Sequence, residues 1–287
     1  MRPGAALPHN GLLFFLRPPM PDEPSPTSLP AAAAELPGQR ELHELHELHE
    51  LRERIAHAAH IAVLTGAGVS AESGVPTFRD DKNSYWAQFN PQDMASEAGF
   101  RAHPQRVWQW YAHRREAVAA VQPNAGHHAL AQWALQHPGR MTLVTQNVDG
   151  LHQRAGSPGV LCLHGELMRD RWLERPRACC DLAGLNPGEP PQCPVCGNLV
   201  RPGVVWFGES LPMGVWQAAE AAVQRCEVLL VVGTSGAVYP AAGLARIARR
   251  AGAHVAVINP APSELDDAAH QCLRGPSAQI LPALLAG

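Results

Sequence analysis

The chain has 287 residues, enough for one large domain or two smaller ones with a buried core. Hydrophobic residues make up 46% of it and charged residues 17%, which excludes a disordered chain, and the net charge of −3 gives no electrostatic case for nucleic acid or an anionic membrane. The only strongly apolar N-terminal run, residues 11–16, is too short to span a bilayer. Seven cysteines are too few and too clustered for a secreted disulfide scaffold. We therefore expect a cytoplasmic protein with no membrane or nucleic-acid partner.

The first segment, residues 1–40, is rich in proline with Ser, Thr and Ala between, and we expect it to be a disordered leader. From Glu41 the triplet Glu-Leu-His repeats three times. This repeat favours a low-complexity helix over a metal site made by its histidines. One folded domain is expected over residues 41–287.

Short apolar runs alternate with longer stretches of helical spacing after residue 60. The predicted strands are residues 60–65, 141–145, 160–163, 228–232 and 254–258, and the predicted helices are residues 107–121, 127–136, 215–225 and 241–251. This alternation predicts an α/β fold, a Rossmann-like parallel sheet with helices on both faces. A small cysteine-containing module interrupts the pattern.

Small and polar residues follow every predicted strand. They are residues 66–79, 145–149, 164–165, 233–235 and 259–260. Because the carboxyl ends of parallel strands meet at one edge of a sheet, these residues predict a nucleotide site. Gly66 and Gly68 allow a tight turn close to a pyrophosphate, and Ser70 can cap the next helix. The next glycine is Gly74, so the G-x-G-x-x-G fingerprint is missing and a hydride-transferring dehydrogenase is disfavoured.

Four cysteines between residues 179 and 196 form a candidate metal site. Cys193-Pro194-Val195-Cys196-Gly197 is typical of a zinc knuckle. The partner pair is irregular, because Cys179 and Cys180 are adjacent and we expect strain if both bind one tetrahedral ion. The pattern favours zinc held by Cys193, Cys196 and one or both of Cys179 and Cys180. The alternative is a degenerate module without metal.

Five motifs, in this order, resemble those of sirtuins, which are NAD-dependent protein-lysine deacylases. The motifs are GAGVSAESGVPTFR at 66–79, TQNVDGLH at 145–152, HG at 164–165, VVWFGE at 204–209 and GTS at 233–235. The similarity covers about residues 50–285. It implies NAD-binding parts at about 50–80, 140–164 and 204–285, a helical insertion at about 81–139 and a zinc module at about 165–203.

The resemblance implies that NAD lies along the strand ends, with its pyrophosphate and nicotinamide ribose on residues 66–86 and its adenosine on residues 233–235 and 259–261. The implied cofactor-binding residues are Gly66, Ala67, Gly68, Ser70, Ala71, Phe78, Arg79, Trp86, Gln146, Asn147, Asp149, Gly233, Thr234, Ser235, Asn259, Pro260, Ala261 and Ser277.

His164 is the catalytic base that the resemblance implies. In sirtuin-like catalysis the acyl oxygen of the substrate lysine attacks C1′ of NAD as nicotinamide leaves, and a base of near-neutral pKa then takes a ribose hydroxyl proton. Asn147 would position ribose and water, and Asp149 would support the nicotinamide pocket. The alternative for Asn147 and Asp149 is ordinary turn formation. A mono-ADP-ribosyltransferase and a catalytically silent NAD-binding scaffold are the competing functions.

Substrate contacts are implied at two places. Val205 and Phe207 would contact the acylated lysine side chain of a protein. Tyr111 and Arg114 share one face of a predicted helix and resemble the pair of the bacterial class III-like sirtuins that remove succinyl and malonyl groups. The alternative is a surface helix with an aromatic ring packed on an arginine stem.

Overall fold

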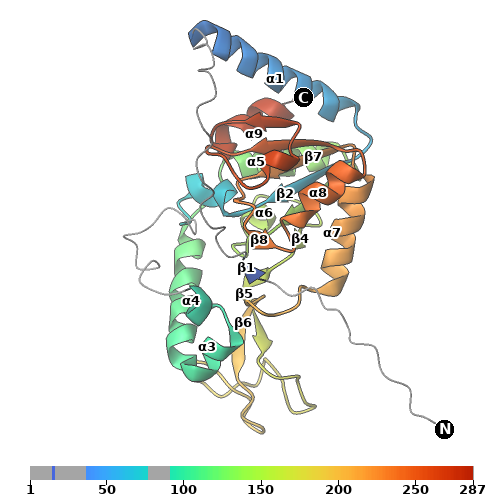
Figure 1. The fold of residues 1–287 in the computed structure, drawn as a ribbon. Coiled ribbons are helices and arrows are strands. Elements are labelled where there is room, and N and C mark those ends of the chain that lie inside the picture. The colour runs from blue at the N-terminus through green and yellow to red at the C-terminus, as the bar shows by residue number, and fades with distance from the viewer. Residues whose placement is uncertain (1–14, 17–36, 77–90, 287) are drawn as a thin grey trace, which may run out of the picture.

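The computed structural model describes residues 15–16, 37–76 and 91–286, and its centre is a six-stranded parallel sheet (Figure 1). The strands are β2 Ile61–Thr65, β3 Met141–Thr145, β4 Leu161–Cys162, β7 Val228–Val232, β9 His254–Ile258 and β10 Gln271–Leu273, in the order β10-β9-β7-β2-β3-β4. The predicted Rossmann-like sheet is confirmed. The short β10 was not predicted, because Gln271-Cys272-Leu273 is not a continuous apolar run.

Helices cover both faces of this sheet. Helices α1 Pro37–His57, α5 Ala125–Gln136 and α9 Ser277–Leu285 lie on one face, and α7 Met213–Arg225 and α8 Gly243–Arg250 lie on the other (Figure 1). Along β2 the side chains of Ile61 and Val63 pack toward the first group, and those of Ala62 and Leu64 toward the second. Burial on both faces explains why the strands are continuously apolar.

The strand order reverses beside β2. From β2 the chain proceeds outward through β3 and β4, and then returns to place β7 on the opposite side of β2. The ends of β2 and β7 therefore flank a topological switch point, which is where open α/β sheets bind their ligands.

A second, smaller lobe lies below the sheet in Figure 1. It contains the antiparallel pair β5 Gly165–Trp172 and β6 Val200–Val204, together with α2 Pro91–Met94, α3 Glu97–Ala102 and α4 Pro104–Ala120. Phe100, Trp110, Tyr111, Leu167 and Trp206 form its core. Strand β5 was not predicted, because its sequence GELMRDRW is mostly charged and exposed.

Several smaller elements complete the described chain. They are β1 Phe15–Leu16, the 3-10 helix η1 Ala67–Ser73, α6 Leu151–Arg154, β8 Val238–Tyr239 and the 3-10 helix η3 Asp266–Ala268. Strand β1 lies within the leader that we expected to be disordered, and it pairs antiparallel with β8. The remainder of residues 1–36 lies outside the described residues.

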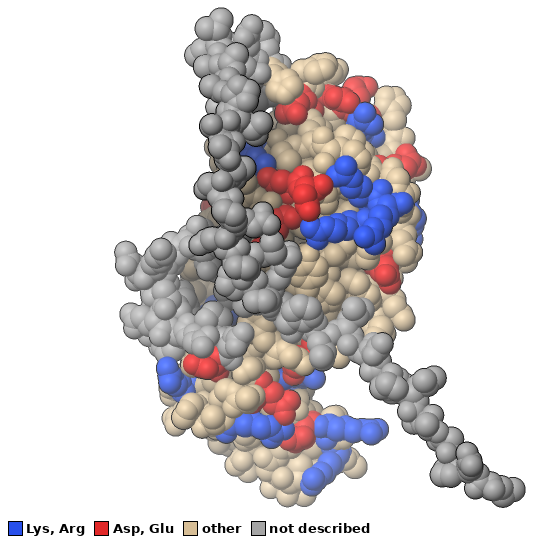
Figure 2. Space-filling model, viewed as in Figure 1, with Lys and Arg blue, Asp and Glu red and all other residues tan. Residues whose placement is uncertain are grey.

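Basic and acidic side chains are interspersed on the face drawn in Figure 2. Ion pairs join Arg246 of α8 to Asp267 at 2.8 Å and Arg274 to Asp266. Within residues 15–16, 37–76 and 91–286, no helix combines the length and hydrophobicity that crossing a bilayer requires.

Candidate active site

Two glycine turns interlock at the switch point. The Gly66 N–H donates to the carbonyl of Val232 at 3.0 Å, and the Gly68 N–H donates to the carbonyl of Gly233 at 2.7 Å. A Cβ on Gly68 would lie 2.7 Å from Cα of Gly233, and Gly233 itself has a φ of 61°. The close approach and the left-handed conformation both require glycine. The turn after β2 is thus held against the turn after β7, with its backbone at the edge of the sheet.

A buried hydrogen-bond network follows the first turn. The Ser70 hydroxyl donates to Oδ2 of Asp149 at 2.8 Å, and Nδ2 of Asn147 donates to Ser70 Oγ at 3.1 Å. Nε2 of His127, on α5, lies 3.4 Å from the same oxygen. The network brings together three of the residues that the sequence indicated. His127 was not among them, because its position in a predicted helix carried no signal of function.

Asp149 is held in place from two sides. In addition to the bond from Ser70, its Oδ1 accepts the backbone N–H of Leu151 at 2.9 Å. Burial raises the pKa of Asp149, and the hydrogen bonds from Leu151 and Ser70 and the charge of Arg114 oppose this shift. The carboxyl group is therefore a fixed element of the site, with little freedom to turn.

His164 follows β4 and is buried, with 7% of its surface exposed. Its Nδ1 lies 2.9 Å from the carbonyl oxygen of Gln146. Because a carbonyl only accepts, Nδ1 carries the hydrogen and Nε2 of the neutral ring carries the lone pair. Burial lowers the pKa of His164 to about 4, below the near-neutral value expected from the sequence. The ring is thus neutral at pH 7, with Nε2 able to accept a proton.

The loops after β3, β7 and β9 are joined by side-chain bonds. Nε2 of Gln146 donates to Oγ1 of Thr234 at 3.1 Å, and Nδ2 of Asn259 donates to the Thr234 carbonyl at 3.0 Å. Ser277, at the start of α9, donates to Glu72 of η1 at 3.2 Å. The remaining indicated residues in this region are Ala67, Ala71, Ser235, Pro260 and Ala261, of which Ala71, Pro260 and Ala261 are exposed. The predicted contacts Phe78, Arg79 and Trp86 lie outside the described residues.

Tyr111 and Arg114 lie on α4, which faces the site from the smaller lobe. Tyr111 is 2% exposed, and its phenol oxygen accepts the indole N–H of Trp206 at 2.9 Å. Arg114 is half-buried, with its guanidinium carbon 4.8 Å from the centre of the Trp110 ring. Burial lowers the pKa of Arg114, and the nearby Tyr111 and Asp149 oppose this shift. The Arg114 guanidinium is therefore within electrostatic range of both the indicated phenol and the Asp149 carboxyl group.

The segment after β6 runs directly beside the candidate base. The Val205 N–H donates to the carbonyl of His164 at 2.8 Å, and the Phe207 N–H donates to the carbonyl of Ala95 at 2.8 Å. Val205 is buried and bonded directly to His164, and Phe207, two residues further along the same segment, is half-buried.

An ion pair that the sequence analysis missed shapes the same segment. Arg201, 1% exposed, pairs with Glu209 and donates to the Val204 carbonyl at 2.6 Å. Glu209 in turn accepts the backbone N–H of Trp206 at 2.8 Å. These bonds hold the ends of the 204–209 loop together, which positions Val205 and Phe207.

All four module cysteines converge, the adjacent pair included. The Sγ atoms of Cys179, Cys180, Cys193 and Cys196 lie within 4.8 Å of one another, and Cys180 and Cys196 are 3.6 Å apart. Thiolates in a tetrahedral zinc site are about 3.8 Å apart. The four residues therefore fit one zinc ion, and the strain expected from adjacent cysteines is not evident, because the turn at residues 177–180 directs both sulfurs inward.

Hydrogen bonds to sulfur support the same assignment. The Arg177 N–H donates to Sγ of Cys180 at 3.3 Å. The backbone N–H groups of Cys196 and Val195 lower the pKa of Cys193, whereas the thiols of Cys196 and Cys193 raise that of Cys179, so in the absence of metal the thiolate character is concentrated on Cys193. Bonds from backbone N–H groups favour the thiolate form that binds metal.

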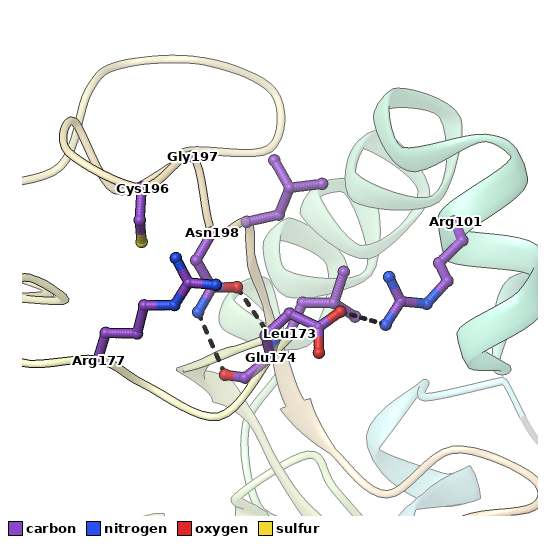
Figure 3. Close-up of a pocket in the computed structure, with 8 residues that line it drawn as sticks. Arg101, Leu173, Glu174, Arg177, Cys196, Gly197 and Asn198 are labelled. Atoms are coloured by element: carbon purple, nitrogen blue, oxygen red, sulfur yellow. Dashed lines mark hydrogen bonds and ion pairs between the residues drawn. The ribbon is translucent and has the colours of Figure 1, made fainter.

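A pocket of about 280 Å³ lies beside this module, between Arg101, Arg177 and Asn198 (Figure 3). Asn198 and Glu174 exchange two hydrogen bonds there, at 3.1 and 3.2 Å, and Glu174 also pairs with Arg101. The pocket lies away from the strand ends, and its bonds join the cysteine module to α3.

The strand order, the interlocked glycine turns and the buried imidazole beside them define a Rossmann-type enzyme that binds a nucleotide cofactor without the dehydrogenase fingerprint. The model of the Sir2 family matches residues 66–240. The chain belongs to the Sir2 family.

Named relatives and solved structures agree with this assignment. The chain is 56% identical to an NAD-dependent protein deacylase of Ralstonia nicotianae over 79% of its length and 91% of the relative. It is 49% identical to an NAD-dependent protein deacylase of Mycolicibacterium paratuberculosis over 78% of its length and 96% of the relative. A solved complex of a Sir2 homologue with NAD matches 83% of this chain and 92% of that one, with a TM-score of 0.73 and 40% identity. A solved structure of a Sir2 enzyme bound to a propionylated peptide matches 83% of this chain and 97% of that one, with a TM-score of 0.71 and 28% identity.

Proposed function

We propose that the protein is an NAD-dependent protein-lysine deacylase that releases nicotinamide and O-acyl-ADP-ribose. The observation that carries this is the buried, neutral His164 beside Asn147 and Asp149 at the switch point, in a chain whose relatives are named for this activity. NAD, when bound, supplies the ADP-ribose that accepts the acyl group. The glycine turns at Gly66, Gly68 and Gly233 would hold its pyrophosphate.

Each residue of the network has a defined task in this proposal. With NAD bound, Nε2 of His164 would be the atom that accepts a proton from a ribose hydroxyl, since Nδ1 is committed to the Gln146 carbonyl. The Asn147 amide holds the ribose and a water molecule, and Asp149 supports the nicotinamide pocket. Val205 and Phe207 enclose the acylated lysine. Cys179, Cys180, Cys193 and Cys196 would hold zinc, which supplies folding energy to the module.

Product analysis separates this function from its competitors. The protein is incubated with NAD and acylated peptides, and the products are identified by mass spectrometry. O-acyl-ADP-ribose with free lysine is the expected result. ADP-ribosylated protein would identify a mono-ADP-ribosyltransferase, and the absence of both products would identify a silent NAD-binding scaffold. The cytoplasmic location and the absence of membrane and nucleic-acid partners remain predictions.

We further propose that succinyl and malonyl groups are substrates in addition to acetyl. The indole N–H of Trp206 donates to the Tyr111 oxygen, so the phenol O–H can itself donate to a carboxylate on the substrate. Among the described residues, no carboxylate forms an ion pair with Arg114. A carboxylate on the substrate would give this half-buried guanidinium an ion-pair partner, and a guanidinium can bind a carboxylate through two parallel hydrogen bonds.

Replacing Arg114 with Met tests this preference. A charge-assisted hydrogen bond contributes about 1.5 to 3 kcal/mol, so kcat/KM for a succinylated peptide should fall roughly 10- to 150-fold. Acetyl-lysine has no distal carboxylate, and its turnover should change little. Arg169→Met, at an arginine of β5 with an exposed side chain, is the control. Equal loss on both substrates, or no loss on the succinylated one, would contradict the assignment.

A further inference from the structure

We propose that His127 and His152 are positioning residues that hold Asn147 and Asp149 in their working orientation. This inference deepens the proposed deacylase and rests on it. Both histidines are buried, with 0% and 1% of their surfaces exposed, and they come from α5 and α6. Each acts through one hydroxyl group.

His127 sets the direction of the Ser70 hydroxyl. The backbone N–H of Asn124 donates to Nδ1 of His127 at 3.3 Å, so the neutral ring carries its hydrogen on Nε2 and donates to Ser70 Oγ at 3.4 Å. Asn147 donates to the same oxygen. With both lone pairs of Ser70 engaged, its hydrogen points to Asp149, at 2.8 Å.

His152 holds the backbone of Asn147 by a parallel route. Thr65 Oγ1 donates to Thr145 Oγ1 at 2.8 Å, so His152 Nε2 is the donor in its 3.0 Å contact with Thr65. Thr145 Oγ1 also accepts the backbone N–H of Asn147, at 3.0 Å. The main chain and the side chain of Asn147 are therefore fixed by two separate chains of bonds, each beginning at a histidine.

The two rings form one buried unit. Their centres are 4.7 Å apart, and burial lowers the pKa of His127 to about 4 and that of His152 to about 3. Both rings are thus neutral at pH 7, which is the state that the two bond chains require. Because these bonds fix both the main chain and the side chain of Asn147 and direct the Ser70 hydroxyl to Asp149, they favour one arrangement of Asn147 and Asp149.

Isosteric variants of His127 provide the test. His127→Gln retains a donor near the place of Nε2, whereas His127→Asn retains only the acceptor near the place of Nδ1. We expect the Asn variant to lose kcat about tenfold with an unchanged KM for the peptide, and the Gln variant to recover most of it. We expect His152→Asn and His152→Gln to change kcat in the same way as the corresponding variants of His127. Equal kcat in the Asn, Gln and unchanged proteins would overturn the inference.

A double-mutant cycle with Ser70→Ala distinguishes positioning from a purely structural role. Because His127 acts through the Ser70 hydroxyl, His127→Asn should change kcat less than twofold once that hydroxyl is gone. A full tenfold effect in the Ser70→Ala background would show that His127 acts only by packing. Formation of O-acyl-ADP-ribose by the protein without substitutions tests the proposed deacylase activity separately from the role of His127. If it makes no O-acyl-ADP-ribose, the same cycle is measured on the NAD dissociation constant by calorimetry.

Discussion

His164 owes its tautomer to a backbone carbonyl and its neutral state to burial. The Gln146 oxygen fixes the hydrogen on Nδ1, and burial keeps the ring neutral, so Nε2 is available as a base over the whole neutral pH range. A lower pKa makes the ring a weaker base than a histidine in water. In the proposed mechanism, the placement of the ring beside Val205 would offset this weaker basicity.

Replacing His164 with Ala should reduce deacylation roughly 100-fold or more, the contribution of a well-placed general base. NAD binding should remain measurable by calorimetry, because the base acts after the cofactor is bound. The matched control is His57→Ala, at an exposed histidine at the end of α1. Turnover retained in the His164→Ala protein would contradict the assignment.

The sequence was sufficient to predict the candidate site residues at the strand ends, but not the residues that hold them in place. Gly66, Asn147 and His164 follow apolar runs, and this position in the sequence identified them as candidate site residues. His127 and Arg201 were missed because they occupy positions that local sequence treats as ordinary helix and strand. Their importance arises from partners 57 and 8 residues away, which only the folded chain brings into contact.

At the scale of elements, the cysteine module is a folded unit between β5 and β6. Its four sulfurs converge at one point, while Asn198 ties the module to the end of β5. None of these cysteines lies at the strand ends that would hold NAD. Metal in this module therefore acts on stability, and we expect no direct effect on the chemical step.

Removing the metal with a chelator should lower the melting temperature. A loss of about 2 kcal/mol corresponds to roughly 4–8 °C for a domain of this size. Cys180→Ser should reproduce the effect, whereas Cys272→Ser, on β10 outside the module, should not. Purified protein with no bound zinc, and a melting temperature that chelation leaves unchanged, would show that the module functions without metal.

Among the strands, prediction succeeded for the continuous apolar runs of the central sheet and failed for β5, β6 and β10, whose sequences contain no such run. Strands β3, β7 and β9 match the predicted runs to the residue, since their burial demands continuous apolar sequence. Strand β5 packs one residue in the lobe core and exposes its charges, so its composition is that of a surface loop.

At the scale of the whole molecule, buried neutral histidines make stability depend on pH. His127, His152 and His164 have folded pKa values of about 4, 3 and 4, against 6.5 in the unfolded chain. Below pH 6.5 the unfolded state binds more protons than the folded state, so the free energy of unfolding falls as pH falls. Above pH 6.5 the pH dependence that these three groups contribute becomes small, because the unfolded histidines also lose their protons.

Urea unfolding at pH 7.5, 6.5 and 5.0 measures this effect. Each histidine contributes up to about 1.4 kcal/mol per pH unit below 6.5, so the loss between pH 6.5 and 5.0 should be several kcal/mol. The change between pH 7.5 and 6.5 should be small by comparison. A free energy of unfolding that stays constant down to pH 5.0 would contradict the burial of these rings in the neutral form.

The position of β2 between β3 and β7 also bears on how the protein forms during synthesis. Residues 66–227, including the whole smaller lobe, are made before β7 exists, and until then one hydrogen-bonding edge of β2 is open. Pairings so distant along the chain make folding slow and leave apolar surface exposed in the meantime. The nascent chain should therefore depend on chaperones until residue 232 has left the ribosome. The turn at Gly233 thus marks the point at which both hydrogen-bonding edges of β2 are paired, and β9 and β10 are added to the sheet only afterwards.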